Sequence, residues 1–296
     1  MVRRGNFDFH AENESLKFAC KEAVDAFPAS IYQRVVRYLY AKESKSSHEI
    51  ERETPTAERA RRFVTLLEQA WERDFLNKEA LIELQNAVVD PRFQNDGYRD
   101  LIDEQIYVGE AIAPGKERIH YVGPKPEDTA FLMESFLETA RKLIDDPLVP
   151  DLAASALIAY MFNYIHPFSD GNGRIHRFLM HHVLAQRQFG PEGIILPISA
   201  VILNRPQDYD RSLESFSHGL LEVITYDLDD NLRMTVHCDS ADYYRNIDAT
   251  VLTEIFYKFA RETINTELPA EVEYLQRHDG CREQMRVIID FPERHA

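Results

Sequence analysis

The chain has 296 residues, of which 44% are hydrophobic and 11% aromatic, so it can bury a substantial core and is not a disordered tail. Its 50 Asp and Glu outnumber its 34 Lys and Arg, which gives a formal net charge of −16. So acidic a surface disfavours binding along a nucleic-acid backbone, and any anion site must therefore be local.

The cysteines and the apolar segments bear on the cellular location of the protein. Cys20, Cys238 and Cys281 lie far apart, which fits neither a disulfide framework nor a zinc cluster. The first residues, MVRRGNFDFHAENES, have no apolar run of the kind a secretory signal needs. The longest apolar stretch, 152–165, is shorter than the roughly 20 residues that span a bilayer. We expect a cytoplasmic protein with neither a membrane nor a nucleic acid as its partner.

Most of the chain has the spacing of amphipathic helices. Gly and Pro are sparse, and apolar residues recur three and four positions apart, so a mainly α fold is predicted. Helices are expected at about 12–26, 29–42, 47–53, 56–74, 78–88, 127–145, 151–165, 173–188, 207–225, 239–265 and 268–287.

The segment SKSSHEIERETPT at 44–56 is unusually polar. Ser46 and Glu49 are spaced as a capping box, which by itself indicates the start of a solvated, charged helix. Ser47 and Glu51 are four residues apart and would share one face of that helix.

One interval departs from the helical pattern. In QIYVGEAIAPGKERIHYV at 105–122, β-branched and aromatic residues flank a Pro-Gly turn signal, which predicts a short β-hairpin. An irregular surface excursion is the alternative.

The stretch HPFSDGNGRIHR, from His166 to Arg177, follows the apolar helix directly. That helix should end at the step from His166 to Pro167, because a residue before proline is pushed out of the helical region. Helical spacing resumes after Gly173. The local architecture is therefore a helix, a tight loop and a second helix.

This loop has the composition of an anion site. Gly171 and Gly173 permit a backbone path that presents successive N–H groups at a helix N-terminus, and Asn172 adds amide donors. Arg174 and Arg177 are three apart and project from one side of the first turn. Arginines are disfavoured at this end of a helix dipole, and a bound polyanion would remove the conflict.

Two further side chains complete a possible reaction centre. Asp170 would repel a phosphate unless a cation such as Mg²⁺ lay between them, and His166 can take a proton near neutral pH. Together these groups suit attack of a hydroxyl on phosphorus. Each feature alone is more often a turn or a helix cap, and only their combination at fixed spacing favours a site.

These twelve residues resemble, position for position, the signature of Fic-domain proteins, His-x-Phe-x-(Asp/Glu)-Gly-Asn-Gly-Arg-x-x-Arg. The surroundings extend the resemblance to roughly residues 85–225. It implies a Fic-type helical core with a small β-hairpin flap, flanked by N- and C-terminal helices. It also implies transfer of AMP from ATP to a Ser, Thr or Tyr hydroxyl of a target protein.

The resemblance also implies roles for single residues. His166 would deprotonate the attacking hydroxyl, Asp170 would bind Mg²⁺, and Phe168 would anchor the loop. The nucleotide-binding positions would be Gly171, Asn172 and Gly173 for the phosphates, Arg174 for the β-phosphate, Arg177 for the γ-phosphate, and Tyr209 near the adenine.

An inhibitory element is implied as well. In the family an inhibitory helix bears (Ser/Thr)-x-x-x-Glu-(Gly/Asn), and Ser47 to Glu51 reproduces its Ser-x-x-x-Glu part, whereas Arg52 departs from it. Glu51 would pair with Arg177 and compete with the γ-phosphate. The family pattern around Tyr209 is also incomplete, because Asp210 and Ser217 replace its usual Tyr and Asn, so the nucleotide preference is open.

This interpretation divides the chain into three regions. They are an N-terminal helical region at 1–85 with the inhibitory helix near 46–53, a Fic core at 86–225 with the flap at 105–122, and a C-terminal helical region at 226–296. The flap would dock the target's backbone as an added strand. Self-modification and a homodimer formed through the C-terminal helices are further options.

Three alternative functions are compatible with the same residues. Glu51 could align a water molecule for the reverse task, removal of AMP from a modified protein. The site could transfer another nucleotide or phosphate-containing group. A catalytically silent scaffold is the third option, although the intact His166, Asp170 and both arginines argue against it.

Overall fold

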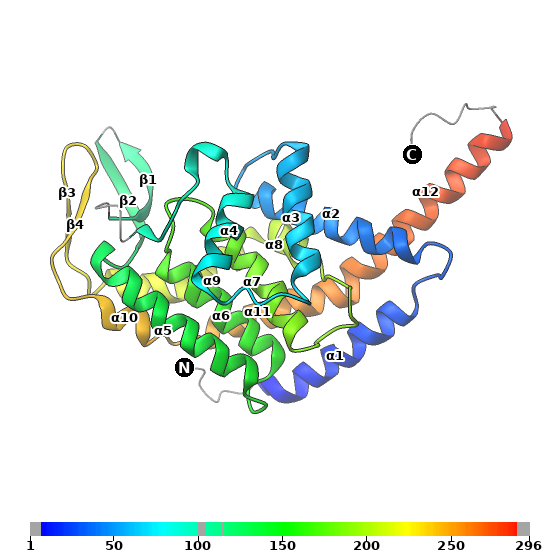
Figure 1. Cartoon of the computed structure of the whole chain (residues 1–296), viewed down its shortest axis with the longest axis horizontal. Helices are drawn as coiled ribbons and strands as arrows, with labels where there is room; N and C mark the ends of the chain where they lie inside the picture. Colours follow the sequence, from blue (N-terminus) through cyan, green and yellow to red (C-terminus); the bar gives the residue numbers. More distant parts are fainter. Residues whose placement is uncertain (1–6, 100–104, 114, 289–296) are drawn as a thin grey trace.

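The computed structural model describes residues 7–99, 105–113 and 115–288, and within these ranges it is mainly α with two small antiparallel hairpins (Figure 1). This confirms the predicted fold class. The longer helices are α1 (Phe9–Asp25), α2 (Tyr32–Ile50), α3 (Ala57–Gln69), α4 (Lys78–Val88), α5 (Pro126–Asp145), α6 (Asp151–Ile165), α7 (Asn172–Gln186), α9 (Pro206–Leu221), α11 (Thr250–Glu262) and α12 (Leu268–Ile288). Shorter elements are the 3₁₀ turn η1 (Pro91–Phe93), α8 (Ile198–Asn204) and α10 (Ala241–Arg245).

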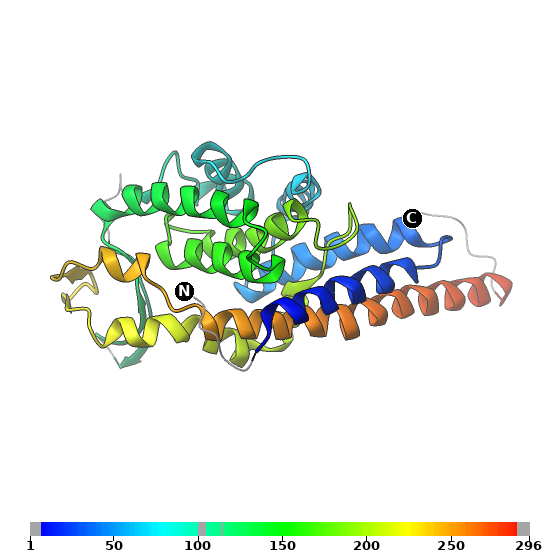
Figure 2. The ribbon, with the colours of Figure 1, turned by 90° about the horizontal axis from the view of Figure 1, so that it is seen from below.

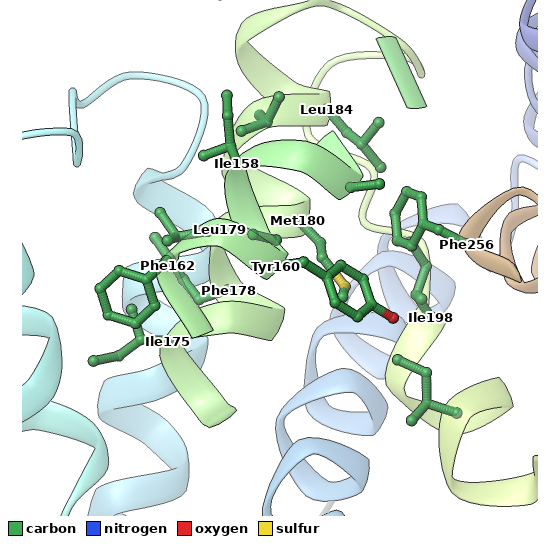
Figure 3. Close-up of a cluster of buried hydrophobic side chains, with 14 of the residues drawn as sticks. Ile158, Tyr160, Phe162, Ile175, Phe178, Leu179, Met180, Leu184, Ile198 and Phe256 are labelled. Atoms are coloured by element: carbon green, nitrogen blue, oxygen red, sulfur yellow. The ribbon is translucent and has the colours of Figure 1, made fainter. Parts of the chain in front are cut away.

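Helices α6 and α7 form the centre of the core. Their facing side chains, among them Phe162 of α6 and Phe178 of α7, gather with Ile198 of α8 and Phe256 of α11 in one buried cluster (Figure 3). The apolar stretch at 152–165 is therefore the interior helix that the sequence predicted. Within the part of the chain that the structure describes, no helix is long and apolar enough to cross a membrane.

The segment that contains Ser47 differs from the prediction. The two helices expected at 29–42 and 47–53 are a single helix, α2, which ends at Ile50. No Gly or Pro interrupts residues 32–50, and the polar side chains of Ser44 and Ser46 are buried against neighbouring elements, so the helix continues through them. The expected capping box at Ser46 is therefore inside a helix and caps nothing.

The C-terminal region also differs. Instead of one helix at 239–265 and a break before 268, α11 continues through the π-helical turn η3 (Thr263–Glu267) into α12. Pro269 has no N–H to give to the preceding turn, and the wider π turn carries the helix past it. Helix α8 and the hairpin of β3 (Tyr226–Leu228) and β4 (Met234–Val236) were not predicted, because elements this short have almost no periodic signal.

Helices α1, α2 and α12 lie side by side and extend from the body of the molecule (Figures 1 and 2). Arg34 of α2 pairs with Asp279 of α12 at 2.7 Å. Lys42 of α2 pairs with Glu267 and Glu271. These ion pairs position α2 along its length, and its last turn then lies beside α7 in the core.

The predicted hairpin at 105–122 is confirmed. Strand β1 (Tyr107–Ala113) pairs antiparallel with β2 (Lys116–Val122), and Pro114 at its turn lies outside the described residues. At its base, Tyr121 donates a hydrogen bond from its hydroxyl to the carbonyl of Tyr164, the penultimate residue of α6. The hairpin is thereby fixed next to His166.

Candidate active site

His166 ends α6 in a left-handed backbone conformation, with φ of +53°. The buried Arg99 holds this turn, because its Nε donates to the carbonyl of His166 at 3.0 Å and its backbone N–H donates to that of Pro167 at 2.8 Å. The turn reverses the chain, so that Phe168 enters the core with no exposed surface. Phe168 therefore is the loop anchor that the sequence predicted.

Asn172 closes the loop. Its side-chain oxygen accepts from the backbone N–H of Phe168 at 3.1 Å, and its amide donates to the carbonyl of the same residue at 2.7 Å. The side chain is buried and both of its polar ends are used within the loop. Of the donors expected from Asn172, the side-chain amide is thus used within the loop, and the expectation of a phosphate contact rests on its backbone N–H in the first turn of α7.

Gly171 is the N-cap of α7, with φ of +92°, a conformation that favours glycine. A side chain there would also meet Val89 of the segment after α4, since a Cβ atom would lie 2.8 Å from its Cγ1. Asp170 accepts a hydrogen bond from the N–H of Gly171 at 2.6 Å. Gly171 is therefore needed both for the positive φ of the turn and for the close contact of the loop with the end of α4.

Arg177 is fully buried, and the end of α2 surrounds its guanidinium. Its Nε donates to Ser47 Oγ at 2.9 Å, and its Nη2 donates to the Ser47 carbonyl and to Glu51 Oε1, both at 2.7 Å. The sequence predicted that Glu51 pairs with Arg177, and the structure brings these two residues into contact. The hydrogen bonds from Arg177 to Ser47 were not predicted.

Glu51 also lies over the backbone of Gly173. A Cβ atom at Gly173 would collide with Glu51 Oε1, so the carboxylate occupies the space next to the expected phosphate cradle. Burial raises the pKa of Glu51, but the charge and hydrogen bond of Arg177, with a further contribution from Arg174, outweigh burial and lower it overall. Glu51 is therefore ionised at neutral pH and neutralises Arg177.

The turn that carries Glu51 is a Schellman motif. The N–H of Glu53 donates to the carbonyl of His48 at 3.0 Å, and the N–H of Arg52 donates to that of Glu49 at 2.9 Å. Arg52 has φ of +57°, which explains in physical terms why glycine or asparagine suits this position better than arginine.

Arg174 has an acidic partner that the sequence reasoning missed. Its Nη1 donates to Glu53 Oε2 at 2.6 Å and to the Val88 carbonyl at 2.9 Å, while its Nη2 donates to Asp170 Oδ1 at 2.8 Å. Glu53 is two residues beyond Glu51. The only sequence signal was this Glu-x-Glu spacing, which indicates nothing until the turn geometry is known.

His166 has the tautomer that a base needs. Its Nδ1 lies 3.2 Å from the carbonyl of Asn163, so the proton is assigned to Nδ1 and Nε2 keeps its lone pair. Burial, together with the charge of Arg99, lowers the pKa of His166 to about 4. The imidazole is therefore neutral at physiological pH and able to accept a proton.

Residues 75–184 match the model of the Fic/DOC family. The chain contains a Fic domain. The match covers the motif from His166 to Arg177 and the helices that hold it.

Curated relatives of this Fic domain are named protein adenylyltransferase Fic. Those from Nematostella vectensis and Aedes aegypti are 30% and 32% identical to the chain over 143 and 124 residues. The matches cover 48% and 40% of this chain, but only 29% and 21% of the relatives. The chain thus matches less than a third of the length of these proteins.

Solved structures share the fold over most of the chain. A Fic family protein from Desulfovibrio desulfuricans G20 covers 91% of this chain and 78% of its own, with a TM-score of 0.60 at 19% identity. A Fic domain containing signaling protein from Bacteroides thetaiotaomicron VPI-5482 covers 88% and 96%, with a TM-score of 0.58 at 18% identity. The arrangement of most of the chain, including helices outside the matched domain, is therefore shared with these two structures.

Tyr209, the expected adenine-site residue, lies in the first turn of α9, next to Arg177, the last residue of the Fic motif. Its hydroxyl is 3.5 Å from Arg177 Nη1, and its ring lies 6.2 Å from that of His176. The side chain is 8% exposed. In this state Tyr209 therefore contacts Arg177 and presents little surface to a base.

Asp170 fits the role of a single metal-binding carboxylate. Its side chain is 33% exposed, and Oδ1 accepts the hydrogen bonds given above. Among the described residues, no group of three or more His, Cys, Asp or Glu could hold an ion by itself. This donor set fits Mg²⁺ shared with substrate phosphates, an ion that commonly takes one carboxylate and completes its shell with phosphate and water oxygens.

Proposed function

We propose that this Fic-domain protein transfers AMP from ATP to a hydroxyl group of a target protein. The observation that carries the proposal is the arrangement of His166, with its lone pair on Nε2, in the loop that leads to the N-terminus of α7. The names of the curated relatives agree with it. The mechanism below follows from the side chains in place.

ATP would bind with its phosphates at the first turn of α7, where the N–H groups of Asn172 and Gly173 and the positive end of the helix dipole favour an anion. Arg174 and Arg177 would neutralise the outer phosphates. Asp170 would hold Mg²⁺, which supplies charge neutralisation at the phosphates when it is bound.

His166 would act as the general base. Its Nε2 accepts the proton of the target hydroxyl while that oxygen forms a bond to the α-phosphorus. The bond from the α-phosphorus to the bridging oxygen breaks, and pyrophosphate leaves with the negative charge. Since the imidazole is neutral down to a pH of about 4, the base is available across the physiological range.

The flap would present the target. Six of the seven residues of β1 are exposed, whereas β2 becomes buried toward its C-terminal end. An extended segment of the target could pair with β1 and bring its hydroxyl to His166. The residue type modified, and the target itself, are set by that segment.

Glu51 would keep the enzyme in an inhibited state. Its carboxylate occupies the Arg177 partner position and covers Gly173, so the γ-phosphate of ATP meets both a negative charge and a filled space. A nucleotide that bound without displacing Glu51 would have to place its phosphates elsewhere.

The test is intact-mass analysis after incubation of the full chain with Mg-ATP, with Glu51→Gly as the released form. We expect a gain of one adenylyl group in Glu51→Gly, little or none in the unaltered chain, and none in Glu51→Gly with His166→Ala. An unchanged mass in Glu51→Gly, in the presence of bound nucleotide, would refute the transferase function.

A further inference from the structure

The turn after α2 places two carboxylates, and not one, on the arginines of the Fic motif. Glu51 pairs with Arg177, and Glu53 pairs with Arg174 at 2.6 Å. The side chains of Arg174 and Arg177 are 2% and 1% exposed, while those of Glu53 and Glu51 are 33% and 36% exposed. The acidic residues therefore cover the arginines from the solvent side.

The contact of Glu53 is directed at the guanidinium. Arg174 Nη1 is shared between Glu53 and the Val88 carbonyl, and Nη2 is bound to Asp170. Arg174 Nε is buried and has no hydrogen-bond partner among the described residues. Because Nε is buried, an incoming anion would have to reach the Nη atoms, and Glu53 already occupies Nη1.

The local charge shows the effect of the second carboxylate. Asp170, Glu51 and Glu53 contribute three negative charges, which the three positive charges of Arg59, Arg174 and Arg177 balance. Removing either glutamate would leave this cluster with a net charge of +1, which favours an anion. Both glutamates would therefore disfavour a bound nucleotide by lowering the local electrostatic potential as well as by occupying the arginines.

Glu53 also has a second partner that can hold it when it leaves Arg174. Its Oε2 lies 2.8 Å from Arg59 Nη2, in the first turn of α3. Arg59 is 13% exposed and also donates to the Val88 carbonyl at 2.7 Å. The carboxylate could therefore rotate away from Arg174 and stay paired with Arg59.

We propose that Glu53 is a second inhibitory residue, whose carboxylate stands in for a β-phosphate oxygen on Arg174, as Glu51 stands in for a γ-phosphate oxygen on Arg177. This rests on the proposed function, from which the two phosphate positions are taken. A nucleoside triphosphate must then displace two carboxylates, and a nucleoside diphosphate must displace Glu53. Glu53 therefore sets the affinity for every nucleotide with a β-phosphate.

The two roles can be separated by calorimetric titration with Mg-ADP and Mg-ATP. The chain carries His166→Ala to prevent turnover, alone or with Glu53→Gln, Glu51→Gln or Glu49→Gln. Glu49 is the matched control, because it lies in the same turn but pairs with the exposed Lys45 at 3.6 Å. Gln keeps the size of the side chain and an acceptor for Arg59.

We expect Glu53→Gln to tighten ADP and ATP alike, by about tenfold, and Glu51→Gln to tighten ATP more than ADP. Glu49→Gln should leave both affinities within about twofold. A structural role for Glu53 would weaken binding or leave it unchanged, and either result overturns the proposal, as does a gain confined to ATP. If Glu53→Gln fails to give a cooperative melting transition, Glu53→Ala takes its place with the same expected gain.

The outcomes also separate this proposal from the proposed function. If no variant binds either nucleotide, both fail. If Glu53→Gln tightens ADP but Glu51→Gly with His166 intact transfers no AMP, the role of Glu53 stands and the transferase function fails. If Glu51→Gly transfers AMP while Glu53→Gln binds ADP as the control does, only the role of Glu53 is overturned.

Discussion

At the scale of single residues, the site is a set of charges that satisfy one another before any nucleotide arrives. Arg177 is buried, and its hydrogen bonds go to Ser47, Glu51 and Tyr209. A buried cation that loses its partner is strongly destabilised, whereas a phosphate could take the same position. Glu51, the proposed inhibitory residue, is therefore also the residue that neutralises the buried Arg177.

This dual role predicts opposite effects of Glu51→Gln on activity and stability. We expect more AMP incorporated from labelled ATP into the chain itself, and a melting temperature that is lower because Arg177 loses its counter-charge. Mg-ATP should restore the melting temperature in the variant more than in the unaltered chain, since a ligand stabilises the form it binds. Lower incorporation together with a lower melting temperature would indicate that Glu51 is structural and not inhibitory.

The sequence predicted one of these contacts, the pair of Glu51 with Arg177, and the structure brings the two into contact. Ser47 and Tyr209 were named as candidate site residues, but their hydrogen bonds with Arg177 were not predicted. Glu53 and Arg99 could not be found in this way, because their positions depend on a Schellman turn and on the packing of the segment after α4. Neither feature has a periodic signal in the sequence.

At the scale of elements, the segment from Ser47 to Glu51, proposed to be inhibitory, is the end of a long helix and not a short helix of its own. Helix α2 passes through its Ser-rich segment because packing buries those side chains, a tertiary effect that local propensity does not contain. The motif therefore takes its position from a 19-residue helix anchored on α12 by Arg34 and Lys42.

The left-handed Arg52 predicts a simple stabilising change. A residue with a side chain at this backbone conformation costs about 1–2 kcal/mol, and glycine removes that cost while losing roughly 0.5–1 kcal/mol through the greater freedom of the unfolded chain. Arg52→Gly should therefore raise the free energy of unfolding by about 0.5–1 kcal/mol, measured by urea denaturation. Arg52→Ala, which keeps the strain, should give no such gain.

Arg52→Gly also tests whether the turn holds Glu51 against Arg177. If the Schellman turn fixes Glu51 on Arg177, the stabilised Arg52→Gly variant should incorporate no more labelled AMP than the unaltered chain. A stabilised Arg52→Gly with clearly raised incorporation would show that the strained turn is needed for inhibition.

At the scale of the whole molecule, one buried cluster joins the N-terminal, central and C-terminal helices. The predicted division at 85 and 225 stays a prediction, since side chains of all three regions share this core. Burial in it lowers the pKa of His176 to about 3 and that of His182 to about 4. Both residues are therefore neutral in the folded protein at any pH at which it is usually studied.

These two histidines predict acid sensitivity with a definite sign. Their folded pKa values lie below the unfolded value of about 6.5, so the unfolded chain takes up protons first as the pH falls, and the folded state loses stability below pH 6.5. Each should cost about 2 kcal/mol between pH 7 and pH 5. Urea denaturation across that range measures the slope.

The contribution of one histidine can be isolated. His176 packs with its ring 4.6 Å from that of Tyr160, so His176→Phe keeps the shape of the core without the titrating group. The variant should lose about 2 kcal/mol less than the unaltered chain over the same range. An identical slope in the two proteins would contradict the assignment.

The two hydrogen bonds by which Asn172 closes the loop on Phe168 have a consequence for binding. The conformational entropy of the loop is lost when the protein folds and not when the nucleotide arrives. The proposed phosphate cradle is thus preorganised, so under the proposed function its affinity would be lowered by Glu51 and Glu53 and not by any need to order its backbone. Removal of the two carboxylates should therefore raise the affinity without any change in the backbone of the loop.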